Sequence, residues 1–270
     1  MSPKEICSTL VAGIRDYFNK NNFKKAVIGL SGGIDSSVSA CLAVMALGKE
    51  NVAALLMPDL GTSSEESIKD AKDLAGKLGI QKFEIPINDF IQNFLEIIQQ
   101  LNISRNVHAI ANAKARTRMM LLYYFANAHN ALVIGTSDKS EIALGYATKF
   151  GDNAADISVI GDLWKTELIE LGRYLEVPDA ILSKKSSAEL ILGNTAEKEL
   201  GASYEVLDKI LKMRIEEGLS AENIIKKGFD KGIVTNVFDR IRVNEHKRKT
   251  PIILKLSEQS FHGMMNSFND

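Results

Sequence analysis

The stretch "AVIGLSGGIDSSVSACLAVMAL", residues 26–47, decides how this chain folds. Its first apolar run is typical of a buried strand, and its second predicts a helix that ends at Gly48. A glycine-rich turn that enters a helix collects free backbone N–H groups and the positive end of the helix dipole at one point. Gly32 and Gly33 allow an anion to approach that backbone, and hydroxyl donors are available from Ser31, Ser36 and Ser37. We therefore expect this turn to bind phosphate.

The turn lacks the two common phosphate-binding motifs. No Gly-Lys-Ser/Thr follows it, as in a P-loop, and G-x-G-x-x-G is also missing. Asp35 allows two interpretations, because it can be a helix N-cap in an ordinary turn or a metal ligand. A carboxylate repels phosphate unless Mg²⁺ lies between them, and Mg²⁺ favours carboxylate together with phosphate oxygens. We prefer the metal ligand, because a cap needs one polar residue and this turn offers several.

Strand and helix signals alternate along the chain, which predicts an α/β fold with a doubly wound parallel sheet and helices on both faces. We expect about five strands in the order 3-2-1-4-5. Four of them are predicted at 24–30, 51–57, 82–87 and 131–136, and a shorter one within 156–163. The chain from Lys165 onward is mainly helical and more charged, so we interpret residues 1–270 as a single domain with a helical C-terminal extension.

Composition limits the classes of function. The 270 residues carry a net charge of −1, which gives no reason to expect nucleic acid or an anionic membrane as partner. The two cysteines, Cys7 and Cys41, suit a reducing compartment and provide no disulfide framework. No apolar run approaches membrane-spanning length, and the N-terminal residues lack a signal-peptide pattern. We expect a cytoplasmic, soluble protein.

A second informative region is "ALVIGTSDKSEIALGYATKFGDNAADISVIGDLWKTEL", residues 131–168. Asp138 and Glu141 have the spacing of a helix-capping pair. However, the first and fourth strands are neighbours in the predicted sheet, and ligands bind beyond their carboxyl ends. This topology places Asp35 and Glu141 on facing loops, where they could form a Mg²⁺ pair. Both interpretations of Glu141 remain open.

"GLSGGIDSS" resembles the loop of the N-type ATP pyrophosphatases, which cleave ATP between its α and β phosphates. Together with residues 131–168, it makes the chain similar to the ammonia-dependent NAD synthetases from about Lys24 to Pro251. The resemblance implies that nicotinate adenine dinucleotide (deamido-NAD) is adenylated by ATP and then amidated by ammonia to give NAD. The implied ATP-binding residues are Gly29, Leu30, Ser31, Gly32, Gly33, Ile34, Asp35, Ser36, Thr136, Lys165 and Ser187.

The same resemblance implies a dinucleotide site. Its residues would be Arg116 in "AKARTRMM", Lys149, Asp152, Asp156, and His246 and Lys247 in "NEHKRKTP". The family is dimeric, so we expect a homodimer in which the last two residues come from the partner subunit. Arg116 could instead be a solvated helix charge. We expect Asp152, Lys165 and Asp35 to be catalytic, Asp152 as the base that deprotonates ammonium, unless its carboxylate only bonds its own loop. Residues 184–208 resemble a loop that closes over ATP.

Other functions remain as alternatives. A tRNA-modifying enzyme of the same ATP-cleaving group would normally add a basic RNA-binding domain or a catalytic cysteine pair, and neither is evident here. An ATP-binding sensor without catalysis is disfavoured by Asp35, Glu141 and Lys165. We also expect the chain to use free ammonia rather than glutamine. Cys7 and Cys41 lie on apolar helix faces, so neither resembles the activated nucleophile that a glutaminase needs.

Overall fold

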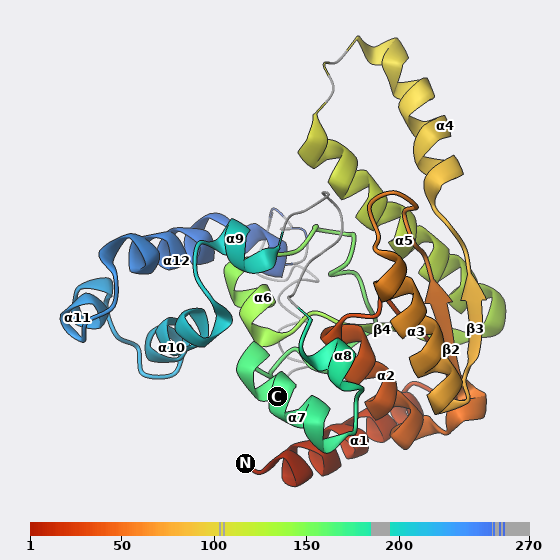
Figure 1. Ribbon diagram of the computed structural model, residues 1–270, viewed down its shortest axis with the longest axis horizontal. Coiled ribbons are helices and arrows are strands. Elements are labelled where there is room, and N and C mark those ends of the chain that lie inside the picture. Colours follow the sequence, from red (N-terminus) through yellow and green to blue (C-terminus); the bar gives the residue numbers. More distant parts are fainter. Residues whose placement is uncertain are drawn as a thin grey trace.

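The computed structural model describes residues 1–102, 104, 106–184, 195–249, 251, 254 and 256. Within these residues, one sheet of five parallel strands has the order β3-β2-β1-β4-β5, which confirms the predicted topology (Figure 1). The strands are β1 (Lys25–Gly29), β2 (Val52–Leu56), β3 (Gln81–Glu84), β4 (Ala131–Gly135) and β5 (Ile157–Ser158). The last strand is much shorter than the predicted segment, because only two of its residues pair with β4.

Strand residues alternate between two hydrophobic clusters, as expected for a sheet covered on both faces. Ile28 and Ile134 belong to one cluster, and Val27 and Val133 belong to the other. The first cluster is covered by α1 (Pro3–Lys20), α2 (Ile34–Leu47), α3 (Glu65–Leu78), α7 (Lys165–Tyr174) and α8 (Asp179–Leu182). The second is covered by α4 (Asn88–Ile98) and α5 (Val107–His129).

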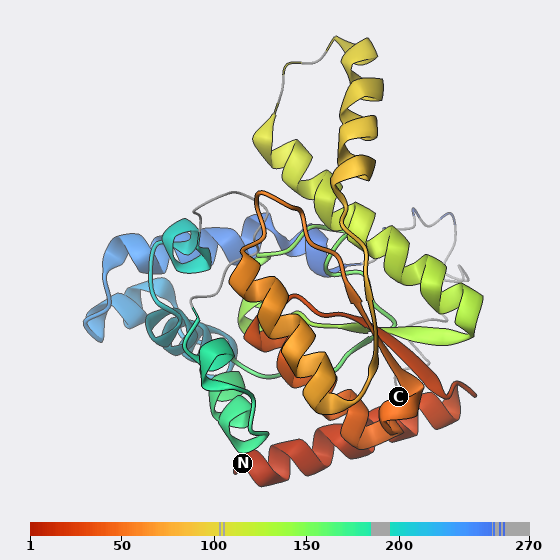
Figure 2. The same ribbon diagram turned by 45° about the vertical axis from the view of Figure 1, so that its right-hand side comes forward.

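The C-terminal helices enclose a hydrophobic cluster of their own. They are α9 (Ala196–Leu200), α10 (Tyr204–Ile215), α11 (Ala221–Lys226) and α12 (Lys231–Val243). Trp164 and the short helix α6 (Lys139–Leu144) join this cluster from the sheet domain. The extension therefore packs directly behind the loop that follows β4 (Figure 2). Three short 3₁₀ helices complete the described structure, at Lys49–Asn51, Gln99–Leu101 and Glu245–Arg248.

Local signals explain several helix ends. Ser2 and Glu5 form a capping box at the start of α1, and Gly48 ends α2 with a positive φ. α4 and the start of α5 project away from the sheet as a hairpin (Figures 1 and 2). A search of the described helices finds none with the length and apolarity needed to span a membrane.

Candidate active site

A cleft opens at the carboxyl ends of β1, β2 and β4, the edge at which the sequence predicted ligand binding. The loop between β1 and α2 forms one wall, and the residues after β4 form another. Eight of the predicted ATP-binding residues line it: Gly29, Leu30, Ser31, Gly33, Ile34, Asp35, Ser36 and Thr136. Gly32 is buried within the same loop, and Ser187 lies outside the described residues.

The glycine-rich loop is held by its own serines. Gly33 is the N-cap residue of α2, and its carbonyl oxygen accepts hydrogen bonds from the hydroxyls of Ser36 (3.1 Å) and Ser37 (2.7 Å). Ser37 is fully buried, so its hydroxyl supports the loop and does not face the cleft. Asp35 lies in the first helical turn after the cap, so its interpretation as the N-cap residue is wrong. The first N–H groups of a helix lack intrahelical partners, and an anion can bind there.

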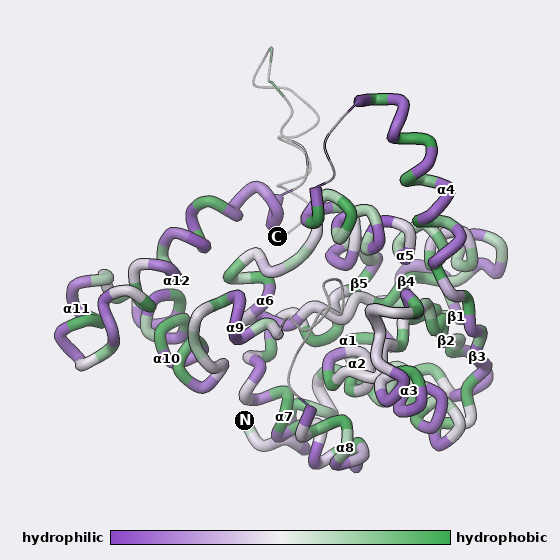
Figure 3. The backbone as a smooth tube through the Cα atoms, turned by 45° about the horizontal axis from the view of Figure 1, so that its top comes forward, coloured by the Kyte–Doolittle hydropathy of each residue, from purple (hydrophilic) through white to green (hydrophobic). Residues whose placement is uncertain are grey.

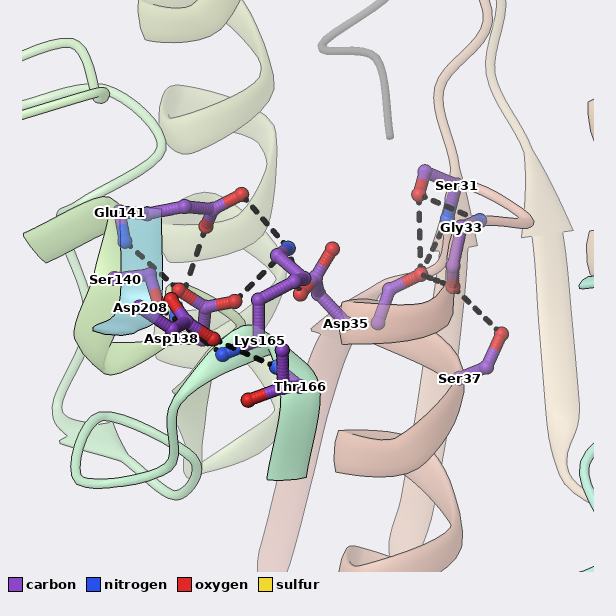
Figure 4. Close-up of polar contacts among 11 residues, drawn as sticks. Ser31, Gly33, Asp35, Ser37, Asp138, Ser140, Glu141, Lys165, Thr166 and Asp208 are labelled. Carbon is purple, nitrogen blue, oxygen red and sulfur yellow. Dashed lines mark hydrogen bonds and ion pairs between the residues drawn. The ribbon is translucent and has the colours of Figure 1, made fainter. Parts of the chain in front are cut away.

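The side chain of Lys165 lies at the centre of three carboxylates (Figure 4). Its Nζ is 2.5 Å from Asp35 Oδ1, 2.9 Å from Asp138 Oδ2 and 3.1 Å from Glu141 Oε1. Lys165 is only 1% exposed, and Asp138 is fully buried. The structure thus brings Asp35 and Glu141 together, as predicted, and adds Asp138. Asp138 and Glu141 also form the capping box of α6, so the capping interpretation of this pair is confirmed.

Burial and neighbouring charges raise the pKa values of Lys165, Asp138 and Glu141. Burial alone would lower the pKa of Lys165, but Asp138, Asp35 and Glu141 hold it well above its ordinary value. Burial raises the pKa of Asp138 to about 6, although Lys165 opposes this shift. Burial likewise raises the pKa of Glu141 well above its ordinary value. Three carboxyl groups therefore share one ammonium group, whose charge opposes the effect of burial on Asp138 and Glu141.

The donor set fits a divalent cation. One oxygen from each of Asp35, Asp138 and Glu141 lies within 4.8 Å of the others, and Asp35 borders the cleft beside the glycine-rich loop. Hard oxygen ligands of this kind are the ligands that Mg²⁺ prefers.

The predicted dinucleotide residues gather beside the segment that follows α6. Arg116 donates from Nη2 to the carbonyl oxygen of Lys149 (3.2 Å), and Lys149 donates from Nζ to the carbonyl oxygen of His246 (2.6 Å). Lys247 donates from Nζ to the carbonyl oxygens of Gly145 and Ala147, both at 2.8 Å. His246 therefore lies against Lys149 of its own chain, and Lys247 lies against Gly145 and Ala147. Arg116 is exposed, but its contact with this cluster goes beyond a purely solvated charge.

Asp152 and Asp156 differ in their surroundings. Asp152 borders the cleft and accepts the Thr148 N–H at 2.6 Å, so it does bond its own loop. Its carboxyl is reached by solvent but lies in a crowded concave wall, and the resulting desolvation raises its pKa. Asp156 does not line the cleft, and its carboxylate accepts the Val133 N–H at 2.7 Å. The structure therefore gives Asp156 a role in the sheet.

The sequence and fold match characterised proteins over nearly the whole chain. A family model for NAD synthase matches residues 6–251. The chain belongs to the NAD synthase family. The NH(3)-dependent NAD(+) synthetase of Fusobacterium nucleatum is 41% identical over 253 residues, which cover 94% of this chain and 96% of that protein. The structure of NMN synthetase from Francisella tularensis has a TM-score of 0.85 and 36% identity, and the match covers 95% of this chain and 100% of that one.

Some relatives in the NAD synthase family are much longer. The Glutamine-dependent NAD(+) synthetase of Thermotoga maritima is 45% identical over 267 residues, which cover 96% of this chain but only 46% of that protein. This chain therefore spans about half the length of the glutamine-dependent relative and nearly all of the ammonia-dependent one. The predicted membership of the family is confirmed.

Two cationic side chains in this NAD synthase site were not predicted from the sequence. Lys184 borders the cleft, and its Nζ lies 3.3 Å from the Gly32 carbonyl oxygen and 2.6 Å from Asp70 Oδ2. Arg118 borders the opposite wall and donates from Nε to the Met57 carbonyl oxygen at 2.9 Å. Lys184 brings an ammonium group to the glycine-rich loop, whose own sequence has no lysine. It begins the segment that resembles a loop closing over ATP, but the sequence does not show that its side chain reaches Gly32.

Proposed function

We propose that this chain forms NAD from deamido-NAD, ATP and ammonia, with release of AMP and pyrophosphate. One observation carries the proposal. Asp35 and Glu141, two of the carboxylates that surround Lys165, border the same cleft as the glycine-rich loop. A loop for anionic phosphates beside a cation-binding carboxylate cluster suits attack on a phosphorus atom. The family membership supplies the reaction in which these parts are used.

The reaction consists of two displacements. An oxygen of the nicotinate carboxylate bonds to the α-phosphorus of ATP, and the bond from that phosphorus to the pyrophosphate oxygen breaks. Ammonia then bonds to the activated carbonyl carbon, AMP leaves, and the nitrogen loses one proton. Backbone N–H groups at the start of α2 would hold the leaving pyrophosphate. Lys165 would stabilise phosphoryl charge, and Asp152 would take the proton that ammonium must lose before it can attack as ammonia.

We further propose that Asp35 and Glu141 hold Mg²⁺, with Asp138 as a third carboxylate. Bound Mg²⁺ would act as a Lewis acid toward phosphate oxygens. Asp35 borders the cleft, and the capping box at the start of α6 holds Asp138 in place. Lys165 would then lie beside the ion and share its carboxylates.

One assay tests the reaction. The purified chain should release pyrophosphate only when ATP, a magnesium salt and deamido-NAD are all present, and it should form NAD when an ammonium salt is added. Because one structural relative is named an NMN synthetase, nicotinate mononucleotide is assayed in parallel. Faster turnover of the mononucleotide would contradict the choice of deamido-NAD, and no pyrophosphate with either compound would contradict the reaction.

Asp152→Asn is expected to separate the two steps. Asparagine keeps an acceptor for the Thr148 N–H, so the loop should retain its conformation. It cannot take a proton from ammonium, so NAD formation should fall by about a hundredfold while pyrophosphate release continues. In the unchanged chain, amidation should decline as pH falls through the raised pKa of this carboxyl. Equal losses of both products in the variant would contradict the assignment of Asp152 as the base.

We propose that free ammonia is the nitrogen source and that neither cysteine takes part. Both cysteines are free and buried, and burial raises the pKa of Cys41 to about 11 and that of Cys7 above its ordinary value. At pH 8, only about one Cys41 in a thousand would be a thiolate. We expect iodoacetamide to modify neither thiol in the native protein and both in denaturant, as measured by mass spectrometry. Free buried thiols also fit our proposal of a cytoplasmic location. Glutamine-dependent NAD formation that is lost in Cys41→Ser would contradict this proposal.

We propose that the chain forms a homodimer through the projecting α4–α5 hairpin. Phe90, Phe94, Ile97 and Leu101 recur at helical spacing, and all are at least 43% exposed. Green segments accordingly alternate with purple ones along the exposed α4 (Figure 3). A stripe of exposed apolar side chains is typical of a protein interface. Ile97→Glu should convert the dimer into monomers in sedimentation experiments, whereas Ile215→Glu, at another exposed apolar site, should not. A dimer that survives Ile97→Glu would place the interface elsewhere.

A further inference from the structure

A buried carboxylate on the C-terminal extension contacts the segment that carries Lys165. Asp208 lies on α10 and is only 2% exposed. Its Oδ1 accepts the Ser140 hydroxyl at 2.5 Å, and its Oδ2 accepts the Thr166 N–H at 2.9 Å (Figure 4). Neither of these partners is a charged side chain. The buried carboxylate is stabilised only by these two neutral hydrogen-bond donors, and such bonds are strong only while the donors stay in place.

Asp208 acts as a helix cap supplied from another helix. α7 begins at Lys165, and its N-cap residue is Trp164, whose side chain has no oxygen that could accept the first N–H groups. The Asp208 carboxylate accepts the Thr166 N–H, and the Ser140 hydroxyl accepts the Lys165 N–H at 3.0 Å. A negative charge at a helix N-terminus is also favoured by the helix dipole. The start of α7 is therefore fixed by α10 and α6.

The same contacts fix Lys165 from both ends. Its backbone N–H is bound by Ser140, and its ammonium group lies among Asp35, Asp138 and Glu141. Tyr204, one turn before Asp208 on α10, places its ring 5.1 Å from Lys165 Nζ. Tyr204 of α10 thus contacts Lys165 itself, and Asp208 of α10 contacts the next residue, Thr166. A shift of α10 relative to α7 would displace the lysine directly.

We propose that Asp208 is a positioning residue, which holds the start of α7 so that the Lys165 ammonium stays at the reacting phosphate. This inference rests on the proposed function, because it assigns Lys165 to the adenylation step. It makes that step depend on the C-terminal helices, although none of their described residues except Ala196 borders the cleft. Asp208 acts through Lys165 and touches no substrate.

The test is the variant Asp208→Asn. Asparagine has the same shape and keeps one acceptor oxygen, but it loses the negative charge at the start of α7. We expect kcat for pyrophosphate release to fall by about tenfold to a hundredfold, with KM for deamido-NAD unchanged, because a small displacement of a reacting group is costly. Lys212→Met is the matched control. It removes another contact between α10 and α7, the Lys212–Glu167 ion pair at 2.7 Å, and should leave kcat unchanged.

A double-mutant cycle separates positioning from a general structural role. If Asp208 acts through Lys165, Asp208→Asn should lower kcat far less in a Lys165→Arg background than in the unchanged chain. Ser140→Ala removes the hydrogen bond to the Lys165 N–H without changing any charge, and it should also lower kcat. If Asp208→Asn does not fold, the result for Ser140→Ala decides the question. Equal losses in both backgrounds, or unchanged kcat in the variant that folds, would overturn the proposal. If the protein without substitutions releases no pyrophosphate, that result would instead overturn the proposed function.

Discussion

Asp35→Asn is expected to lower the rate of pyrophosphate release by about a hundredfold or more while the protein stays folded. The variant removes one of the carboxylates proposed to hold Mg²⁺, and this carboxylate lies at the mouth of the cleft with 21% of its side chain exposed. Folding should tolerate the change, because Asp138 and Glu141 still face Lys165. Glu141→Gln should act in the same way. The measurements are initial rates over a range of magnesium concentrations and the midpoint of thermal unfolding.

Asp162→Asn provides the matched control. Asp162 forms an exposed ion pair with Lys139 at 2.9 Å, close to α6 but outside the cleft. Exposed pairs contribute little to stability, so both the rate and its magnesium dependence should remain unchanged. Turnover at the unchanged rate in Asp35→Asn, or an unchanged magnesium dependence in both site variants, would contradict the metal assignment.

The sequence predicted those features whose signal is local. The strands β1, β2 and β4 are continuous apolar runs, so their existence was predictable, and right-handed connections between parallel strands restrict the order of the sheet. The glycine-rich turn between β1 and α2 was predictable because its residues are contiguous in the sequence, whereas its binding of phosphate stays a prediction. The short β5 was overestimated, since the apolar residues after Ser158 pack in a turn that contains Gly161 and do not pair with β4.

Contacts between distant segments could not be predicted in this way. Lys184 meets Gly32 across 152 residues, and Ser140 meets Asp208 across 68. In the sequence, each of these residues looks like an ordinary polar position of a helix or loop. Asp156 was assigned to the dinucleotide on the resemblance, yet its carboxylate accepts a backbone N–H of β4. A sequence pattern does not show which of two hydrogen-bonding roles an aspartate fulfils.

Gly32→Ala is expected to abolish ATP-dependent turnover. Gly32 has a φ of +81°, and a Cβ atom at this position would lie 2.1 Å from the carbonyl oxygen of Ser67. The left-handed conformation costs a non-glycine residue about 1–2 kcal/mol. The clash adds to this cost, because the obstacle is the backbone of α3 and not a flexible side chain. The loop must therefore move away from α3, which also displaces the Gly32 carbonyl that Lys184 contacts.

A displaced loop no longer aligns the N–H groups of α2 with the phosphates. Pyrophosphate release should therefore fall by about a hundredfold or more, and the unfolding midpoint should also decrease. Gly218→Ala separates the two causes, since Gly218 has a φ of +68° but nothing within 4 Å of its added Cβ. Backbone strain should lower the stability of that variant by a similar amount, but the variant should keep its activity. Calorimetry should detect weak binding of ATP to Gly32→Ala or none, because the proposed phosphate site is built from this backbone. Normal ATP affinity in Gly32→Ala would mean that the triphosphate binds elsewhere in the cleft.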